Sequence, residues 1–311
     1  MAGGKTRKQN YWLGGLFIAL VGGVMWFCHS FFSTGNIEYA VAQTGTITHE
    51  RKVMATFANQ EQPIHAPFSG SIQFMGEDGL RYRRGEVVAT LRPEGAAPGM
   101  IQEGVQEQAI LTTMGGLFFR QTDGLETTIT TENLTFMDLD KLLSQTANVK
   151  IPGVHVQAGE SIGKIVNNLS QTRAFLELTS IEGLTVGSHI RLTVGEQTVS
   201  AKILRKSEKP TGVVVMFPHY IDGSAINRRQ EVIWSYRPPT SGVLVPRSAL
   251  WIQGEELGVF LWSEGVIHFK KVKVLDQNDH QVCIENLVSG IPIVITPRDG
   301  LEGLAANVKK I

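Results

Sequence analysis

The sequence contains few residues that could build a reactive or metal-binding site. Only 2 of its 311 residues are cysteine, Cys28 and Cys283, so neither a disulfide framework nor a multi-cysteine zinc site can form. The 8 histidines lack the His-x-His and His-x3-His spacings that seat a metal on a strand or helix. The Gly-x-Ser-x-Gly elbow, the P-loop and the GxGxxG fingerprint are absent too. We therefore expect a protein that is not an enzyme and that binds no cofactor and no metal.

An excess of charge is also missing. The 29 basic and 29 acidic residues give a net charge of +0, whereas a nucleic-acid binder would carry a basic excess on one face. Binding to nucleic acid is therefore not expected. The densest basic group is Arg81, Arg83 and Arg84. It is either a solvated loop or a candidate contact with an acidic partner.

Long apolar runs are confined to the N-terminus. Tyr11 to Phe32 are 22 positions without Asp, Glu, Lys or Arg, which as a helix would span about 33 Å. Lys5, Arg7 and Lys8 precede the run. Such a basic flank keeps the N-terminus in the cytoplasm. The sequence predicts a cytoplasmic tail over 1–10, a single transmembrane helix over 11–32 and an extracytoplasmic remainder, hence localisation in the cell membrane.

Two further features bear on this anchor. Gly15, Ala19 and Gly23 form a small-xxx-small stripe, a candidate surface for helix packing. Ala40-Val41-Ala42 matches a signal-peptidase pattern, so a cleaved signal peptide is the main alternative. The apolar run is longer than the h-region of a signal peptide, and the cleavage pattern lies well beyond its end. An uncleaved anchor is the better interpretation.

The rest of the chain has the composition of a β-protein, with 33 glycines and 12 prolines that show no collagen-like period. Between residues 60 and 170 a pattern occurs twice: a strand, a glycine, a second strand, a Gly-Glu turn and a further strand. We predict that these four glycines are structural turns, with positive φ at the second glycine of each copy. They are Gly70 and Gly85 in the first copy and Gly116 and Gly159 in the second.

The duplicated pattern resembles the barrel-sandwich hybrid, or lipoyl-like, domain of biotin and lipoyl carriers and of bacterial membrane fusion proteins. The chain has no lysine between Lys52 and Lys141, which excludes covalent cofactor carriage on the hairpin that joins the halves. The joining segment, Pro93 to Ala109, has 17 residues. Two helical arms of about six residues would reach only about 9 Å. The sequence thus predicts a sandwich without the long helical hairpin of efflux adaptors.

The second copy carries an insertion, which we place at 121–153. Gly116 and Gly159 lie 43 positions apart, whereas Gly70 and Gly85 lie 15 apart. Thr135 to Asp138 has the pattern of a capping box, and Phe136, Leu139, Leu142 and Leu143 would share one helical face. We predict a helix around 135–145 that covers an open end of the sandwich; docking of a partner is the alternative.

Short alternating strands from 171 to 240 predict a small β-barrel. The string Val245-Pro246-Arg247-Ser248-Ala249-Leu250 resembles the Val-Pro-x-x-Ala-Leu segment that opens the membrane-proximal domain of HlyD-type and RND-type membrane fusion proteins. In those relatives a later Gly-Leu-x-x-Gly-Asp segment is usual, and this chain departs from it with Asn286 and with Ile291-Pro292. We assign 33–59 to a linker and anchor-proximal strands, 60–170 to the sandwich and 241–311 to the membrane-proximal domain.

The resemblance implies a mainly β, non-catalytic, membrane-anchored adaptor in an export, efflux or other cell-envelope complex. Its partner would be an integral membrane transporter or another envelope protein, and a homo-oligomer is left open. The alternative is an extracytoplasmic receptor-like module whose barrel binds a ligand or a wall polymer. Exposed aromatic side chains on a concave face would favour that alternative.

The predicted topology can be tested with intact spheroplasts. Because the basic tail should hold the N-terminus inside, protease added from outside should digest the chain beyond Ser33. Immunoblotting against tags at both ends measures this. Complete protection of the C-terminal tag, or a mature N-terminus at Gln43, would contradict the topology.

Overall fold

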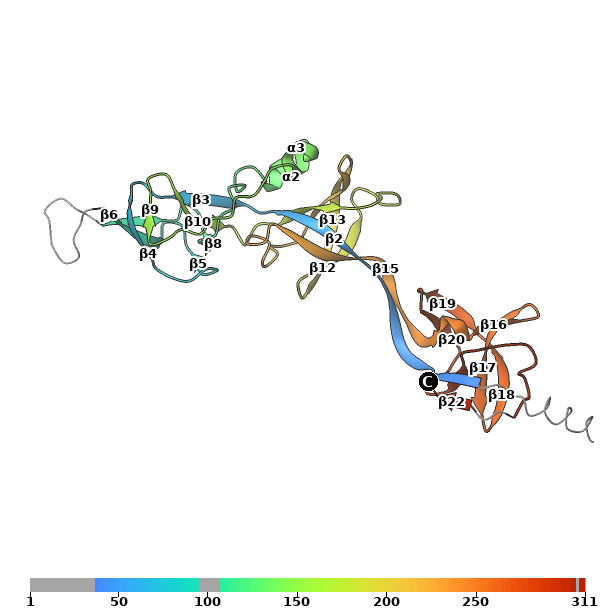
Figure 1. Cartoon of the computed structure of the whole chain (residues 1–311). Helices are drawn as coiled ribbons and strands as arrows, with labels where there is room; N and C mark the ends of the chain where they lie inside the picture. The colour runs from blue at the N-terminus through green and yellow to red at the C-terminus, as the bar shows by residue number, and fades with distance from the viewer. Residues whose placement is uncertain (1–36, 95–106, 306–307, 311) are drawn as a thin grey trace, which may run out of the picture. The chain divides into compact units, whose positions relative to one another are not determined.

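The computed structural model describes residues 37–94, 107–305 and 308–310 (Figure 1). The chain divides into a central unit, residues 50–237, and a terminal unit, residues 1–49 and 238–311. The predicted transmembrane helix 11–32 and its stripe Gly15, Ala19 and Gly23 lie outside the described residues. Within the described ranges no helix is long and apolar enough to span a membrane. The prediction of a mainly β protein is confirmed.

A sandwich of two four-stranded sheets forms one part of the central unit. The first sheet has the order β3(Glu61–His65)-β10(Ser161–Val166)-β8(Gly116–Phe119)-β5(Arg81–Tyr82), and the second has the order β7(Gln108–Leu111)-β6(Val87–Pro93)-β4(Gly70–Phe74)-β9(His155–Val156). Each strand pairing in one sheet has its equivalent in the other. The β4–β6 pair corresponds to β8–β10, the β4–β9 pair to β8–β5, and the β6–β7 pair to β10–β3. The duplication is therefore a structural pseudo-twofold. The inward side chains of both sheets form one buried core that includes Leu91, Phe118 and Ile165.

The four predicted turn glycines serve two different purposes. Gly85 and Gly159 have φ of 78° and 80°, as the Gly-Glu turns require. Gly70 and Gly116 are not turns with positive φ, because they begin β4 and β8. A Cβ there would lie 2.1 Å from a backbone carbonyl oxygen of a neighbouring strand. Close approach of two backbones, and not a turn, is what requires glycine at these two positions.

The glutamates of the two turns also match. The Glu86 carboxylate accepts a hydrogen bond from the Arg83 N–H at 2.7 Å, and the Glu160 carboxylate accepts one from the Gln157 N–H at 2.8 Å. Each carboxylate thus closes its own turn three residues back along the chain. The Gly-Glu pair is a local structural device in both copies.

A six-stranded barrel forms the other part of the central unit. Its order is β12(His189–Val194)-β13(Gln197–Glu208)-β14(Thr211–Met216)-β11(Arg173–Glu177)-β2(Gln43–Ala58)-β15(Arg229–Pro246). Pairing of β15 with β12 closes the circle. Residues 55–58 of β2 pair with β11. This part of the range assigned to a linker and anchor-proximal strands therefore belongs to the barrel. The interior is filled by apolar side chains such as Phe57, Leu192 and Phe217.

The insertion differs from its prediction. It contains two short helices, α2(Thr131–Phe136) and α3(Leu139–Leu143), instead of one helix around 135–145. Thr130 caps α2 by accepting from the Asn133 N–H, and Asp138 caps α3. The predicted capping box at Thr135 is wrong, because the Thr135 hydroxyl donates within α2 to the Thr131 carbonyl.

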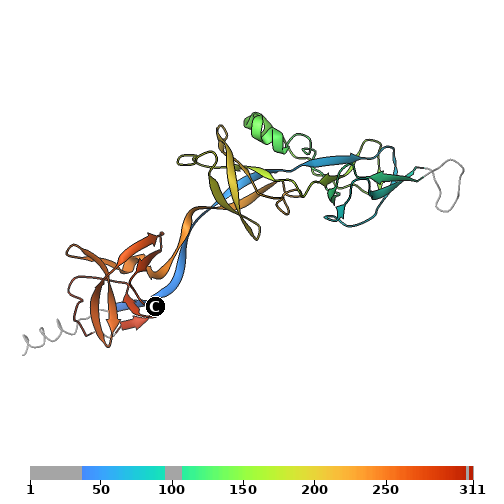
Figure 2. The ribbon, with the colours of Figure 1, turned by 180° about the vertical axis from the view of Figure 1, so that it is seen from behind.

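The insertion also covers a different part of the fold from the one predicted. Leu134, Leu139 and Leu142 pack with Phe175 of β11 and Val214 of β14. Both views place α2 and α3 beside the barrel strands (Figure 1, Figure 2). The insertion therefore covers the outside of the barrel and not an open end of the sandwich. Phe136, assigned to the apolar face, is 81% exposed at the end of α2.

The terminal unit is a β domain. Its sheet has the order β16(Leu250–Gln253)-β17(Glu256–Ser263)-β21(Pro292–Val294)-β1(Ile37–Val41)-β22(Val308–Lys310), and β18(Val266–Lys271) pairs with β17. β19(Lys273–Gln277) pairs with β20(Gln281–Glu285), which pairs with the end of β15. In the Val-Pro-x-x-Ala-Leu segment, the 3-10 helix η1(Arg247–Ala249) follows β15. Val245 and Ala249 are both buried in the core of this unit, so the apolar positions of the segment are core residues.

Gly85→Val and Gly159→Val test the duplicated turns. A β-branched residue is strained at positive φ, so each change should lower the free energy of unfolding by about 1–3 kcal/mol. Urea denaturation measures the loss. Gly153→Val is the matched control, since Gly153 is exposed and does not have positive φ. Unchanged unfolding of both test variants, or an equal loss in the control, would contradict the argument.

Candidate functional site

Five charged side chains lie buried where the sandwich, the insertion and the barrel meet in the central unit. Glu61 belongs to β3 and Lys164 to β10, Asp123 and Glu126 come from the insertion, and Arg228 directly precedes β15. Their side chains are between 0% and 8% exposed. Charged residues are seldom buried so completely unless they are paired. We call this cluster the ionic joint.

Glu61 is the centre of the ionic joint. Its Oε2 accepts hydrogen bonds from Lys164 Nζ at 3.0 Å and from Arg228 Nη2 at 2.7 Å. Its Oε1 accepts from Asn59 Nδ2 at 3.3 Å. Lys164 Nζ also lies 3.8 Å from Glu126 Oε1. One carboxylate of the sandwich thus binds cations from two parts of the fold.

Arg228 links the insertion to the barrel. Its Nε donates to Asp123 Oδ2, and its Nη2 donates to Asp123 Oδ1 at 3.1 Å, a two-point contact that fixes direction as well as distance. Its Nη1 lies 3.4 Å from the carbonyl oxygens of Phe57 and Ile129. Every nitrogen of the guanidinium group therefore has an acceptor.

The two insertion carboxylates also shape their own loop. Asp123 Oδ1 accepts from the Leu125 N–H at 3.0 Å, and Glu126 Oε1 accepts from the Asp123 N–H at 2.7 Å. These bonds satisfy backbone donors that the loop would otherwise leave unpaired. The insertion therefore begins from a fixed turn that is anchored in the ionic joint.

The pKa shifts in the joint follow from competition between burial and pairing. Burial alone would raise the pKa of Asp123, but the hydrogen bond and charge of Arg228, with the charge of Lys164, lower it overall. Burial alone would lower the pKa of Arg228, but Glu61 and Asp123 raise it overall. Outside the joint, Tyr220 packs in a cluster with Phe119 and Val166, and burial, helped by Asp222 and Glu61, raises the pKa of Tyr220 to about 12. The charged forms of Arg228 and Asp123 are thus the stable ones at neutral pH, and they hold structure together.

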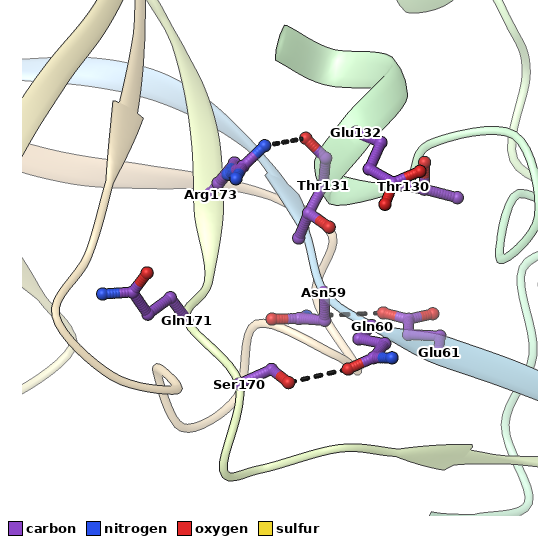
Figure 3. Close-up of a pocket in the computed structure, with 9 residues that line it drawn as sticks. All are labelled: Asn59, Gln60, Glu61, Thr130, Thr131, Glu132, Ser170, Gln171 and Arg173. Atoms are coloured by element: carbon purple, nitrogen blue, oxygen red, sulfur yellow. Dashed lines mark hydrogen bonds between the residues drawn. The ribbon is translucent and has the colours of Figure 1, made fainter.

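A polar cavity of about 400 Å³ adjoins the ionic joint. It is lined by Asn59, Gln60, Glu61, Thr130, Thr131, Glu132, Ser170, Gln171 and Arg173 (Figure 3). Arg173 Nη1 donates to the Thr131 carbonyl at 2.8 Å, and the Ser170 hydroxyl donates to Gln60 Oε1 at 2.7 Å (Figure 3). These contacts tie α2 to the barrel, and the segment before β11 to the connection between β2 and β3. The cavity belongs to the same connection between the two parts.

The predicted contact residues lie elsewhere. Arg81, Arg83 and Arg84 are exposed on β5 and the turn that follows it, and the structure does not bring them to the ionic joint. Sequence reasoning missed the joint itself. The one available signal was Lys164, a lysine inside the otherwise apolar strand β10, where every residue after Ser161 is buried.

Comparison with known proteins supports the resemblance to membrane fusion proteins through the sandwich. The family model "RND related, barrel-sandwich hybrid domain" matches residues 61–167. No curated protein sequence matches the chain.

Among solved structures, the chain is similar to ZneB from Cupriavidus metallidurans, with 13% identity and a TM-score of 0.32; the match covers 87% of this chain and 94% of that one. It is also similar to MacA from Actinobacillus actinomycetemcomitans, with 12% identity and a TM-score of 0.34; that match covers 83% of this chain and 99% of the other. At these values the two structures carry no argument about function.

Replacement of Arg228 tests the ionic joint. Arg228→Met would leave the carboxylates of Glu61 and Asp123 buried without their main partner, so we expect a loss of about 3–5 kcal/mol in the free energy of unfolding. Arg229→Met is the matched control, because Arg229 is 59% exposed in its pair with Glu177 and should cost no more than about 1 kcal/mol. Urea denaturation at pH 7 measures both. Equal losses would show that the joint does not stabilise the fold.

The ionic joint also predicts a pH dependence of stability, which a comparison of the native protein with Arg228→Met tests. The pKa of Asp123 is lower in the folded chain than its ordinary value of 3.8, so its contribution is complete above that value and is lost as pH falls through the folded pKa. Stability of the native protein should therefore decline below about pH 4, and more steeply than that of Arg228→Met. Parallel acid denaturation curves would contradict this assignment.

Proposed function

We propose that this chain is a non-catalytic, membrane-anchored adaptor of an export, efflux or other cell-envelope complex. Its sandwich, residues 61–167, is a barrel-sandwich hybrid domain of the RND-related type. The uncharged run 11–32 supplies the anchor in this proposal, with the N-terminus in the cytoplasm and the domains outside. An integral membrane transporter or another envelope protein is the partner, beside which copies of the chain assemble.

The direct connection of the two sandwich halves is the observation that carries the proposal. Strands β6 and β7 remain paired to Leu91 and Gln108, and Arg92 lies 3.7 Å from Glu107 in an ion pair. Only residues 95–106 remain between the described ends. A segment of this length cannot form the two helices of several heptads that would reach across a periplasm. Partner contacts therefore lie on the β domains, the Arg81–Arg84 turn and the anchor.

A receptor-like module is the alternative, and the barrel argues against it. The barrel interior is occupied by a continuous core of buried apolar side chains from Ala55 to Val232. A small barrel that holds a ligand keeps part of its interior open. In the residues that the structure describes, no group of three or more His, Cys, Asp and Glu side chains could hold a metal. The filled interior of the barrel fits a scaffold better than a ligand-binding module.

Deletion of the anchor, with its replacement as a control, tests the adaptor role. Deletion of residues 1–32 should release a folded domain that neither copurifies with the membrane partner nor supports function in cells. The matched control replaces residues 11–32 by an unrelated apolar span of equal length and keeps Lys5, Arg7 and Lys8. This control should restore function if the segment only anchors the chain, and should restore membrane location alone if the Gly15-Ala19-Gly23 stripe binds the partner.

Crosslinking in the native membrane, followed by affinity purification, is the measurement. Full function of the released domain would contradict the need for a membrane partner. Specific capture of an outer-membrane channel by that domain would contradict the short reach. Capture of an integral membrane transporter by the full chain, and its loss on deletion, would support the proposal.

A further inference from the structure

The two Gly-Glu turns of the sandwich are closed by the same backbone hydrogen bonds. Two bonds join residues 85–86 of the first turn to Thr112, and both measure 2.9 Å. Two bonds join residues 159–160 of the second turn to Ala66, at 2.8 Å and 2.9 Å. Each position of one turn therefore has a structural equivalent in the other. The second turn shows which side chains the backbone of the first turn can do without.

The side chains on the two turns differ in charge. Three exposed arginines lie on the first turn: Arg81, Arg83 and Arg84. Their equivalents on the second turn are His155, Gln157 and Ala158. Three arginines against the single carboxylate of Glu86 leave residues 81–86 with a net charge of +2. Like charges this close repel one another. The same turn forms elsewhere without any arginine, so the fold does not require these three charges.

The arginines of the first turn are unpaired in the described part of the chain. None of their guanidinium groups forms an ion pair or a hydrogen bond there. The other two arginines of the sandwich behave differently, although they are also accessible to solvent. Arg92 pairs with Glu107 at 3.7 Å, and Arg120 pairs with Asp78 at 3.0 Å. The three guanidinium groups of the turn thus keep all their donors available for another molecule.

An apolar side chain lies beside the arginines. Leu111 pairs with Val87 directly after the turn, precedes Thr112 and is 50% exposed. Its equivalent beside the second turn is His65, which precedes Ala66 in the same way. The planar fork of arginine matches carboxylates and phosphates alike. A phosphate would leave the leucine in water, whereas a protein segment with acidic and apolar side chains would cover both.

We propose that residues 81–86, with Leu111 at their edge, form a docking surface for an acidic segment of a protein partner. Carboxylates of that segment bind the three guanidinium groups, and one of its apolar side chains packs on Leu111. The second turn is not part of the surface, because it carries no arginine. The inference rests on the proposed adaptor role and states the chemistry of the partner at one of its contacts.

Photo-crosslinking of the full chain in its native membrane tests the proposal. p-Benzoylphenylalanine replaces Leu111 in the test variant and replaces His65, the exposed equivalent, in the matched control. The variant at Leu111 should form an adduct with a protein segment in which Asp and Glu outnumber Lys and Arg, as mass spectrometry identifies it. The control at His65 should not form this adduct.

Replacement of Arg81, Arg83 and Arg84 by Gln in the same test variant measures the part played by charge. The yield of the adduct should fall on the order of tenfold or more, because three charge pairs worth about threefold each are lost. Urea denaturation should show that this triple variant keeps its stability, as the second turn predicts. A large loss of stability would mean that the arginines serve the fold, and would overturn the proposal.

The remaining outcomes also decide. An adduct with lipid, an adduct with a segment that has no acidic excess, equal yields at Leu111 and His65, unchanged yield in the triple variant, or no adduct would each overturn the docking surface. The adaptor role can fail separately. If the native chain copurifies with a membrane partner but no acidic adduct forms, only the docking surface is wrong. If the acidic adduct forms equally in a chain without residues 1–32 that supports full function, only the membrane-anchored role is wrong.

Discussion

The ionic joint is the interaction on which the arrangement of the central unit depends. Apolar contact holds surfaces together without fixing their direction, whereas the two-point contact of Arg228 with Asp123 has one geometry. Glu61 extends this contact to Lys164 in the sandwich. Burial of these charges costs free energy that pairing offsets only when the geometry is right. The sandwich, insertion and barrel are therefore favoured in the one arrangement that pairs every charge.

The sequence was sufficient for the sandwich because its determinants are local. Each half repeats the same strands and the same Gly-Glu turn, so the pattern can be recognised without knowledge of spatial partners. The barrel was harder, since residues 55–58 of β2 pair with β11 more than a hundred positions later. Alternation in a strand shows that one face is buried but not which strand lies beside it. The assignment of 33–59 to a linker and anchor-proximal strands therefore wrongly included residues 55–58, which belong to the barrel.

The ionic joint could not be predicted for the same reason. Glu61, Asp123 and Arg228 are far apart in the sequence, and each by itself has the appearance of a surface charge. The helices of the insertion were placed incorrectly because Thr130, Thr135 and Asp138 are all residue types that cap helices. Only the tertiary contact decides among them. Leu134, Leu139 and Leu142 can all reach Phe175 when the chain turns between two short helices.

The position of the insertion changes what this sandwich can do. Extra residues between β6 and β7 would extend the sandwich outward at its joining segment. The extra residues of this chain instead follow β8, and they return along the barrel, where Phe175 and Val214 contact them. Those two side chains point to the outside of the barrel, opposite to Ala174 and Val215 in its core, and would be exposed without the insertion. The added length therefore joins the sandwich to the barrel, because its apolar side chains are buried against the barrel strands and do not extend the sandwich away from them.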